Sequence, residues 1–189
     1  MEPVLGPERF LTFPATERHD MSTRTDSSRP TSALGNVVAL VAFVALALLA
    51  GWIGSLATTP NIPTWYAGLV KPSFNPPNTI FPVVWTILYI VMAVAAWLVW
   101  RTSADKASRR TALIAWFVQL ALNVAWSFAF FGAHSPLAGL IVIVALLIAI
   151  VVTILAFRRI DGLAALLLVP YLAWVAFATV LNAAILSLN

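Results

Sequence analysis

The chain has 189 residues, of which 61% are hydrophobic and only 10% are charged, and its formal net charge is +4. Ordinary soluble domains have about 45–50% apolar and about 25% charged residues, so a globule of this length cannot bury so much apolar side chain. The chain has no cysteine, which excludes disulfide scaffolds, thiolate metal sites and cysteine nucleophiles. The composition therefore indicates a membrane protein.

Residues 1–32 are mixed in charge, contain four prolines and show no helical periodicity. We predict that they form a disordered polar tail ahead of a membrane domain over residues 33–189. The tail lacks an apolar core of the signal-peptide type, so we expect the first apolar segment to be retained. Met21 opens a second plausible start, which leaves the true first residue (Met1 or Met21) open.

Five apolar segments follow, each long enough to cross about 30 Å of hydrocarbon as a helix at about 1.5 Å per residue. Their alanine and leucine content and the absence of a ten-residue alternation favour helices over the strands of a membrane barrel. We therefore predict an all-α fold, an integral membrane bundle of five transmembrane helices. The predicted spans are residues 34–57, 79–100, 111–131, 137–157 and 162–187.

Local signals support the boundaries of the last two spans. Ser135 and Pro136 are typical of an N-cap followed by proline at the first helical position. Asp161 is placed to cap the fifth span and to interact favourably with its helix dipole. Pro170 falls inside that span and predicts a kink.

The basic residues predict the orientation in the membrane. Ten of the eleven lysines and arginines lie in the tail, between the second and third spans, or between the fourth and fifth, and Lys71 is the exception. With five spans those three segments share one side, so the positive-inside rule places the N-terminus in the cytoplasm and the C-terminus outside. We expect contacts with anionic membrane lipid rather than nucleic acid, and five apolar helices favour the bacterial inner membrane.

Residues 58–78, which we call the lid segment, are the long connection on the predicted outer side. They contain five of the twelve prolines, and Trp65, Tyr66 and Phe74 supply apolar anchors. A long connection in a compact bundle is usually functional or disordered, and this proline density favours an ordered lid. The alternative is a stiff connector whose aromatic residues sit at the membrane interface.

Aromatic and amide side chains recur at spacings of three and four on the second, third and fifth spans, so each set shares a helix face. Because amides are costly against lipid, these faces should turn inward, and their depths place them together beneath the lid segment. Such a cavity suits a large, flat, mostly apolar ligand. Interfacial anchoring of the tryptophans and helix–helix bonding by the amides are the alternatives. The candidate ligand-binding residues are Trp85, Tyr89, Asn123, Trp126, Tyr171, Trp174, Ala178, Leu181 and Asn182.

Ionisable groups are absent from the spans, which weighs against a proton relay, an ion-coupled transporter or a voltage sensor. The sequence has no glycine-rich phosphate loop and no histidine and carboxylate cluster with metal-ligand spacing, so no metal site is predicted. Lys71 and His134 are candidate partners for a ligand carboxylate. The alternatives are headgroup contact for Lys71 and a solvated loop position for His134.

The third span also carries small residues at four-residue steps, namely Ala121, Ala125 and Ala129. Such a stripe lets two helix backbones approach closely. We expect a homodimer through this face, with packing inside the monomer as the alternative.

Three long segments carry a resemblance to a known family. They are residues 65–89, which begin Trp-Tyr-Ala-Gly-Leu-Val-Lys-Pro-Ser-Phe-Asn-Pro-Pro, residues 119–132 (Gln-Leu-Ala-Leu-Asn-Val-Ala-Trp-Ser-Phe-Ala-Phe-Phe-Gly) and residues 170–182 (Pro-Tyr-Leu-Ala-Trp-Val-Ala-Phe-Ala-Thr-Val-Leu-Asn). In this order they resemble the tryptophan-rich sensory protein/translocator protein family (TspO/MBR) over residues 34–188.

The resemblance implies a five-helix bundle, usually dimeric, that binds porphyrins such as protoporphyrin IX and haem and, in animals, cholesterol and benzodiazepine-type drugs. It implies no covalent cofactor, and it adds Trp65 to the candidate ligand-binding residues. Ala183 stands where animal members have a tyrosine, and no basic residue follows, so sterol binding through that motif is not expected.

The leading functional interpretation is a non-enzymatic, tetrapyrrole-binding membrane protein with a sensory, regulatory or scavenging role. One alternative is light-dependent degradation of porphyrin, with Trp85 and Trp174 as oxidisable groups. The other is transport of tetrapyrroles or sterols. Enzymatic activity is left open at this point.

Overall fold

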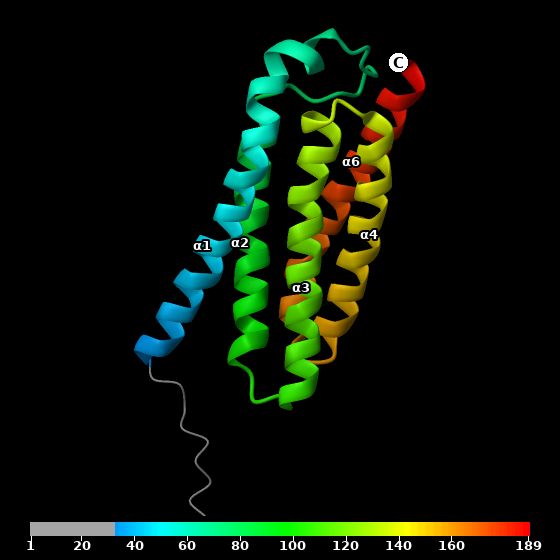
Figure 1. Ribbon diagram of the computed structural model, residues 1–189. Helices are drawn as coiled ribbons and strands as arrows, with labels where there is room; N and C mark the ends of the chain where they lie inside the picture. Colours follow the sequence, from blue (N-terminus) through cyan, green and yellow to red (C-terminus); the bar gives the residue numbers. More distant parts are fainter. Residues whose placement is uncertain (1–32) are drawn as a thin grey trace, which may run out of the picture. The chain divides into compact units, whose positions relative to one another are not determined.

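The computed structural model describes residues 33–189, so the predicted disordered tail, residues 1–32, lies outside the described part. The chain divides into two units, Met1–Pro30 and Thr31–Asn189, and the described helices belong to the second (Figure 1). Residues 33–189 form helices and their connections, without a strand. The helices are α1 (Ala33–Thr58), η1 (Thr59–Asn61), η2 (Ile62–Tyr66), α2 (Ile80–Arg101), α3 (Lys106–Ser127), η3 (Phe128–Gly132), α4 (Pro136–Arg158), α5 (Gly162–Leu167) and α6 (Val169–Leu188).

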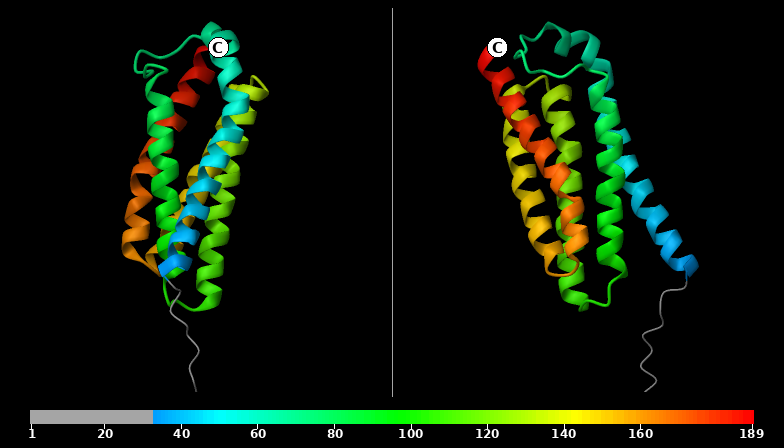
Figure 2. Two further views of the ribbon diagram at one scale, coloured as in Figure 1. Left: turned by 90° about the vertical axis from the view of Figure 1, so that its left-hand side faces the viewer. Right: turned by 180° about the vertical axis from the view of Figure 1, so that it is seen from behind.

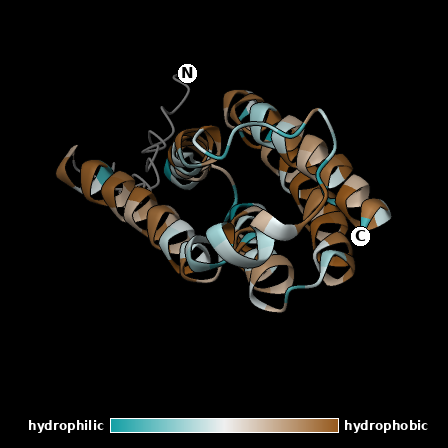
Figure 3. Cartoon of the chain, turned by 90° about the horizontal axis from the view of Figure 1, so that it is seen from above, coloured by the Kyte–Doolittle hydropathy of each residue, from teal (hydrophilic) through white to brown (hydrophobic). Residues whose placement is uncertain are grey.

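Five helical stretches of the described chain are long and apolar enough to cross a membrane, with α5 and α6 together forming the fifth. The prediction of an all-α bundle of five transmembrane helices is therefore confirmed. The stretches form a ring, because α1 packs against α2 and α3, α4 packs against α3 and α6, and α5 packs against α2 (seen from the side in Figure 2 and from above in Figure 3). The five stretches are Ala33–Tyr66, Ile80–Arg101, Lys106–Gly132, Pro136–Arg158 and Gly162–Leu188.

The two ends of the bundle differ in their connections. One end carries the connections around residues 102–105 and 159–161, and we call it the basic end because the flanking side chains there are arginine and lysine. The other end, which we call the lid end, carries the lid segment and residues 133–135 (Figure 1). The basic half of the bundle is closely filled by large side chains such as Met92, Trp116 and Phe157, which are fully buried. A cavity between the helices lies toward the lid end.

The predicted caps are present in the structure. Ser135 accepts a hydrogen bond from the Ala138 amide (3.2 Å) at the start of α4, and Asp161 accepts one from Ala164 (2.9 Å) at the start of α5. These bonds satisfy amides that lack a partner inside their helix. The fifth stretch is interrupted at Leu168, where α5 ends and α6 begins.

The first half of the lid segment is helical, which differs from the predicted loop. Helical turns η1 and η2 continue directly from α1 to Tyr66. The prolines of this stretch stand at the first positions of the short turns, where a missing amide hydrogen is least costly. Thr58, Asn61 and Thr64 each donate a side-chain hydrogen bond to the carbonyl four residues back, which stabilises the stretch further.

The third span begins at Lys106 rather than at residue 111. Asp105 caps it by accepting hydrogen bonds from the amides of Ala107 (2.9 Å) and Ser108 (3.1 Å). The extra turn is polar, so it escapes a search for apolar residues. A cap followed by a charged first turn is the signal that extends the helix.

Candidate ligand-binding cavity

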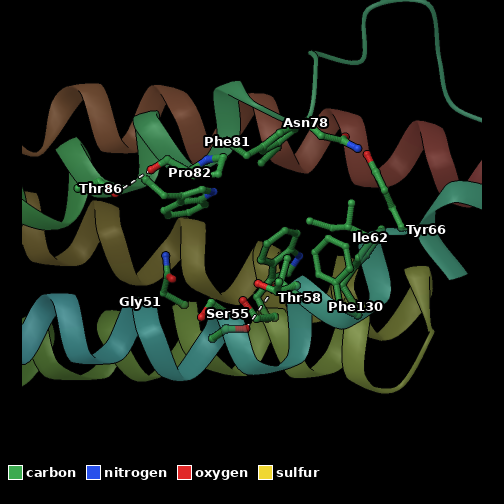
Figure 4. A pocket seen from close by; sticks show the side chains of 18 of the residues that line it. Gly51, Ser55, Thr58, Ile62, Tyr66, Asn78, Phe81, Pro82, Thr86 and Phe130 are labelled. Atoms are coloured by element: carbon green, nitrogen blue, oxygen red, sulfur yellow. Dashed lines mark hydrogen bonds between the residues drawn. The ribbon is translucent and has the colours of Figure 1, made fainter. Parts of the chain in front are cut away.

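A cavity of about 380 Å³ lies among α1, α2, α3 and α6 at the lid end of the bundle. This volume falls within the range of small-molecule sites, about 300–1,000 Å³. Figure 4 shows the side chains that converge on it from α1, the lid segment and α2. Its surface is mainly apolar and strongly aromatic. The aromatic lining residues are Trp52, Tyr66, Phe81, Trp85, Tyr89, Trp126, Phe130 and Phe131.

The cavity is open on the side formed by α1 and α2. Its lining residues from α3 and α6 are buried, apart from the half-buried Trp126. In contrast, Trp52 on α1 is 59% exposed, and Pro82 and Thr86 on α2 are exposed as well. The opening therefore faces the surroundings of the bundle between these two helices, at a height below the lid segment. For a helix bundle in a bilayer, those surroundings are lipid.

Two glycines on α1 allow the neighbouring helices to approach the cavity wall. A Cβ atom at Gly51 would lie 2.5 Å from the Tyr89 ring, and one at Gly54 would lie 3.0 Å from Oγ of Ser127. A side chain at position 51 would clash with the Tyr89 ring, whereas one at position 54 would require a small shift of Ser127. Gly51 thus lets the Tyr89 ring lie directly against the α1 backbone.

Asn123 joins three helices at the inner end of the cavity. The hydroxyl of Tyr89 donates to its Oδ1 (2.5 Å), and its Nδ2 donates to the hydroxyl oxygen of Tyr171 (3.0 Å). All three residues are buried. Hydrogen bonds of buried groups are costly to lose, because the remaining partner has no water to replace them.

Asn182 forms a second cross-helix connection. Its Nδ2 donates to the carbonyl oxygen of Pro136 at the start of α4 (2.8 Å), and its Oδ1 accepts from Nε1 of Trp126 (3.3 Å). The bond to Trp126 holds the indole in place as part of the cavity wall. Asn123 and Asn182 therefore line the cavity and bond neighbouring helices at the same time.

The structure separates the ten candidate residues into two groups. Seven of them line the cavity, namely Trp85, Tyr89, Asn123, Trp126, Ala178, Leu181 and Asn182. Trp65, Tyr171 and Trp174 lie outside the lining. Helical spacing places Tyr171 and Trp174 on the same side of α6 as the lining residues, but the packing of α2 against α6 puts other rings between them and the cavity.

The three outlying residues pack behind the wall. Trp65 contacts Phe130 and stacks on His134 with ring centroids 5.0 Å apart. The ring of Trp174 meets the edge of Phe81, a lining residue, at 5.9 Å. Tyr171 is 1% exposed and reaches the cavity only through its bond with Asn123. These residues support the lining rather than contributing surface to it.

Lys71 and His134 are also outside the cavity lining. The Lys71 ammonium donates to the Leu69 carbonyl (2.9 Å) and lies 4.7 Å from the centre of the Tyr66 ring. Because Tyr66 does line the cavity, only the Tyr66 ring lies between the charge of Lys71 and the cavity. Thus Lys71 and His134, the two residues considered as partners for a ligand carboxylate, stand at the rim of the cavity or beyond it.

His134 connects the α3–α4 connection to the lid segment. Its Nε2 is 2.7 Å from Oδ1 of Asn61, and Nδ2 of that asparagine donates to Ala57. Since the asparagine oxygen is an acceptor, Nε2 of His134 carries the hydrogen. The histidine has a φ of 50°, which suits the tight reversal between η3 and α4.

The rest of the lid segment is held by side-chain bonds. Tyr66 donates to Oδ1 of Asn75 (3.0 Å). The side chain of Asn189, after α6, pairs with the Val70 backbone in both directions, accepting from its amide and donating to its carbonyl, each at 3.0 Å. The lid segment is therefore held by a hydrogen bond within itself and by two hydrogen bonds to the residue that follows α6.

The α1 side of the cavity was not predicted from the sequence. Small and hydroxylated residues recur there every three or four positions within a helix that is otherwise aliphatic. This pattern is a usable signal, because such residues on one helix face permit close approach or line a polar surface. The lining residues from this helix are Leu48, Gly51, Trp52, Gly54, Ser55 and Thr58.

Within residues 33–189, no three histidine, cysteine or acidic side chains lie close enough together to hold a metal ion. The cavity lining itself has hydroxyls, amides and rings but no charged side chain. Its chemistry is thus suited to holding an apolar molecule with a few neutral hydrogen-bonding groups.

Comparison with known sequences decides the family. The TspO/MBR family model matches residues 43–188. The chain belongs to the TspO/MBR family. It is similar to the tryptophan-rich protein TspO of Chlorobaculum tepidum, with 48% identity over 81% of this chain and 97% of that protein. The protein of the same name from Archaeoglobus fulgidus is 44% identical over 82% of this chain and 99% of its own length.

The similarity extends to animal members of the TspO/MBR family. The human translocator protein is 40% identical over 62% of this chain and 70% of its own length. Family membership and the five membrane-spanning helices together make this chain an integral membrane protein. The resemblance seen in three sequence segments is thereby confirmed.

Proposed function

We propose that this TspO/MBR protein binds a tetrapyrrole, such as protoporphyrin IX or haem, without a covalent link, in the cavity beneath the lid segment. The observation that carries this proposal is the lining of the cavity, in which eight aromatic side chains from different parts of the chain surround one space that opens between α1 and α2. A flat macrocycle gains both apolar burial and ring contact in such surroundings. The proposed role is sensory, regulatory or scavenging.

Two tryptophans offer the surface that a macrocycle would contact. Trp126 stacks on Phe130, with centroids 5.6 Å apart and planes 25° apart, so together they form a broad aromatic wall. Trp85 lies on α2, where its ring is 5.8 Å from that of Tyr89. Both indoles are half-buried, so each retains surface for a ligand.

Titration of the purified protein with protoporphyrin IX, followed by tryptophan fluorescence, tests the proposal. We expect saturable quenching and about tenfold weaker binding in the Trp126→Ala variant, since a ring contact and its buried area are worth more than 1 kcal/mol. Trp100→Ala is the matched control, because this indole lies at the basic end and outside the lining of the cavity. Equal binding by the wild type and Trp126→Ala would remove the proposed site.

We propose that the edge of the macrocycle that carries its carboxylates faces the lid segment. The cavity offers no charged partner, and burial of an unpaired carboxylate is expensive. Lys71 and His134 stand at the lid end, where they can meet carboxylates that project from the cavity. Lys71→Gln should weaken binding of protoporphyrin IX but leave binding of its dimethyl ester unchanged. Equal effects on the two compounds would exclude this orientation.

One observation favours a second, enzymatic role, the light-dependent degradation of porphyrin. Trp85 lines the cavity, where it can act as an oxidisable group beside a bound macrocycle, whereas Trp174 lies behind Phe81. Under illumination and in air, porphyrin should then bleach more slowly with Trp85→Phe than with Trp174→Phe. Equal bleaching in the two variants, with unchanged binding, would exclude this role.

We further propose a homodimer that packs through α3 in the bacterial inner membrane, with the basic end in the cytoplasm. Ala121 and Ala125 are exposed and one helical turn apart, and Ala129 is half-buried. Small exposed side chains on one face of a helix allow a second helix to pack closely against it in lipid. Replacing Ala121 and Ala125 by leucine should shift the purified protein toward the monomer in size measurements, and an unchanged size would exclude this interface.

A further inference from the structure

A second hollow lies near the basic end, between the first half of α1 and the last turn of α2. It has a volume of about 220 Å³ and shares no lining residue with the ligand-binding cavity. Figures 1 and 2 show that α1 diverges from the other helices toward its first residues. We call this hollow the α1 groove. It is lined by Ala39, Ala42, Phe43, Leu46 and Trp100.

The α1 groove is lined by alanine, phenylalanine, leucine and tryptophan side chains. On α1, Ala39 and Ala42 contribute small side chains, and Phe43 is packed against the fully buried Trp116, whose ring it meets edge-on at 5.6 Å. From Ala39 to Leu46 it follows about 10 Å of helix, at about 1.5 Å per residue. An apolar surface of this form, on a helix surrounded by hydrocarbon, suits a single acyl chain.

A cation stands at the basic end of the α1 groove. The guanidinium of Arg101, the residue after the groove-lining Trp100, lies 4.6 Å over the Trp97 ring. Trp97 in turn donates from Nε1 to the carbonyl oxygen of Asn36 on α1 (3.0 Å). The indole therefore bridges α2 and α1 and holds Arg101 beside the groove.

The charge of Arg101 is available for a ligand. Its side chain is exposed, and it forms no ion pair within residues 33–189. The acidic residues of that part of the chain are Asp105 and Asp161, and both accept helix-capping amide bonds. A guanidinium presents several donors in a plane and binds phosphate well.

We propose that the α1 groove is a binding site for an anionic phospholipid, with one acyl chain along Ala39–Leu46 and the phosphate at Arg101. Two features support this occupant. The positive charge of Arg101 complements a phosphate, and the groove leads from the basic end of α2 toward the interior of the bilayer. The α1 groove shares no lining residue with the cavity, so lipid binding there can be tested independently of tetrapyrrole binding.

Phospholipids with brominated acyl chains test the site, because bromine quenches a tryptophan that it touches. The full chain, purified in neutral detergent, is titrated with brominated phosphatidylglycerol or brominated phosphatidylcholine. We expect half-maximal quenching at about fivefold lower concentration of the anionic lipid, as one basic residue contributes about 1 kcal/mol. Trp100→Phe should remove most of the component that saturates at low lipid concentration.

Two pairs of variants separate the headgroup contact from the groove. Arg101→Gln should abolish the preference for phosphatidylglycerol, whereas Arg158→Gln, an exposed arginine at the same end on α4, should retain it. Ala42→Leu fills the groove and should weaken quenching by both lipids about fivefold. Ala145→Leu, an exposed alanine on α4, is its matched control and should change nothing.

Three results would overturn the proposal. Equal quenching by the two lipids in the wild type would show that the site does not recognise the headgroup charge. A loss of preference in Arg158→Gln as large as in Arg101→Gln would indicate a general attraction to the basic end. Unchanged quenching in Ala42→Leu, with its folding verified by an unchanged thermal midpoint, would show that no acyl chain occupies the α1 groove.

Discussion

The hydroxyl oxygen of Tyr89 on α2 lies 2.5 Å from Oδ1 of Asn123 on α3, at the inner end of the cavity. The same asparagine donates to Tyr171 on α6, so one amide connects three of the helices that enclose the candidate site. The cavity wall and the stability of the bundle are thus supported by the same side chains.

Tyr89→Phe should destabilise the protein by about 1–3 kcal/mol, because the buried Oδ1 of Asn123 loses its hydrogen-bond donor. The thermal unfolding midpoint in detergent measures this loss. Tyr66→Phe is the matched control. Its hydroxyl bonds to Asn75 in the less buried lid segment, so its midpoint should fall less. Equal midpoints for Tyr89→Phe and the wild type would contradict the assigned role of this bond.

Gly51→Ala should destabilise the bundle and weaken ligand binding together. The added methyl group would lie 2.5 Å from the Tyr89 ring, which must then move toward the cavity, and overpacking of this kind costs about 1–3 kcal/mol. The midpoint of thermal unfolding and the protoporphyrin IX titration report the two effects. Gly68→Ala, where nothing lies within 4 Å of the new atom, should leave both unchanged, and a similar loss there would refute the explanation.

Asn189→Ala should loosen the lid segment. The substitution removes two hydrogen bonds to the Val70 backbone, and a loss of about 1 kcal/mol would raise the dissociation rate of a bound porphyrin about fivefold. Stopped-flow release measures the rate, and hydrogen exchange of residues 69–72 measures the loosening. Ser187→Ala serves as the control, since that hydroxyl bonds only within α6. Equal porphyrin dissociation rates in Asn189→Ala and Ser187→Ala would show that the bonds between Asn189 and Val70 do not slow release.

The cap of α3 should depend on pH. Hydrogen bonds from the Ser108 side chain and from the amides of Ser108 and Ala107 hold the pKa of Asp105 below its usual value, and the charge of Arg109 adds to this. A carboxyl with a lowered pKa in the folded state stabilises the helix start above its ordinary value, about pH 4, and loses that effect as the pH falls through the folded value.

Hydrogen exchange of the first turn of α3 measures this dependence. At neutral pH the amides of Ala107 and Ser108 should exchange faster in Asp105→Ala than in the wild type. The difference should narrow as the pH falls below about 4 and through the lowered pKa of the wild-type carboxyl, where that carboxyl becomes protonated. A difference that stays constant from neutral pH to a pH well below the lowered pKa of Asp105 would show that the charge of Asp105 does not matter to the cap.

The fold was largely predictable because a membrane imposes simple requirements on a sequence. A span needs a long uncharged apolar run, since hydrocarbon accepts neither charges nor unpaired backbone groups. The caps at Ser135 and Asp161 follow from local hydrogen bonding and were equally predictable. The helical form of residues 59–66 was missed, because prolines usually interrupt helices and their tolerance here depends on bonds from Thr58, Asn61 and Thr64.

The sequence by itself determined that this protein spans a membrane five times and which residues share each helix face, because helical periodicity and hydrophobicity are local properties. The tertiary structure decided how far each face is rotated toward its neighbours. It placed Trp85 and Trp126 at the cavity and Trp174 behind Phe81. It also brought Gly51 against Tyr89. Rotation is set by close packing between helices that are distant in the chain, and no pattern within one helix contains that information.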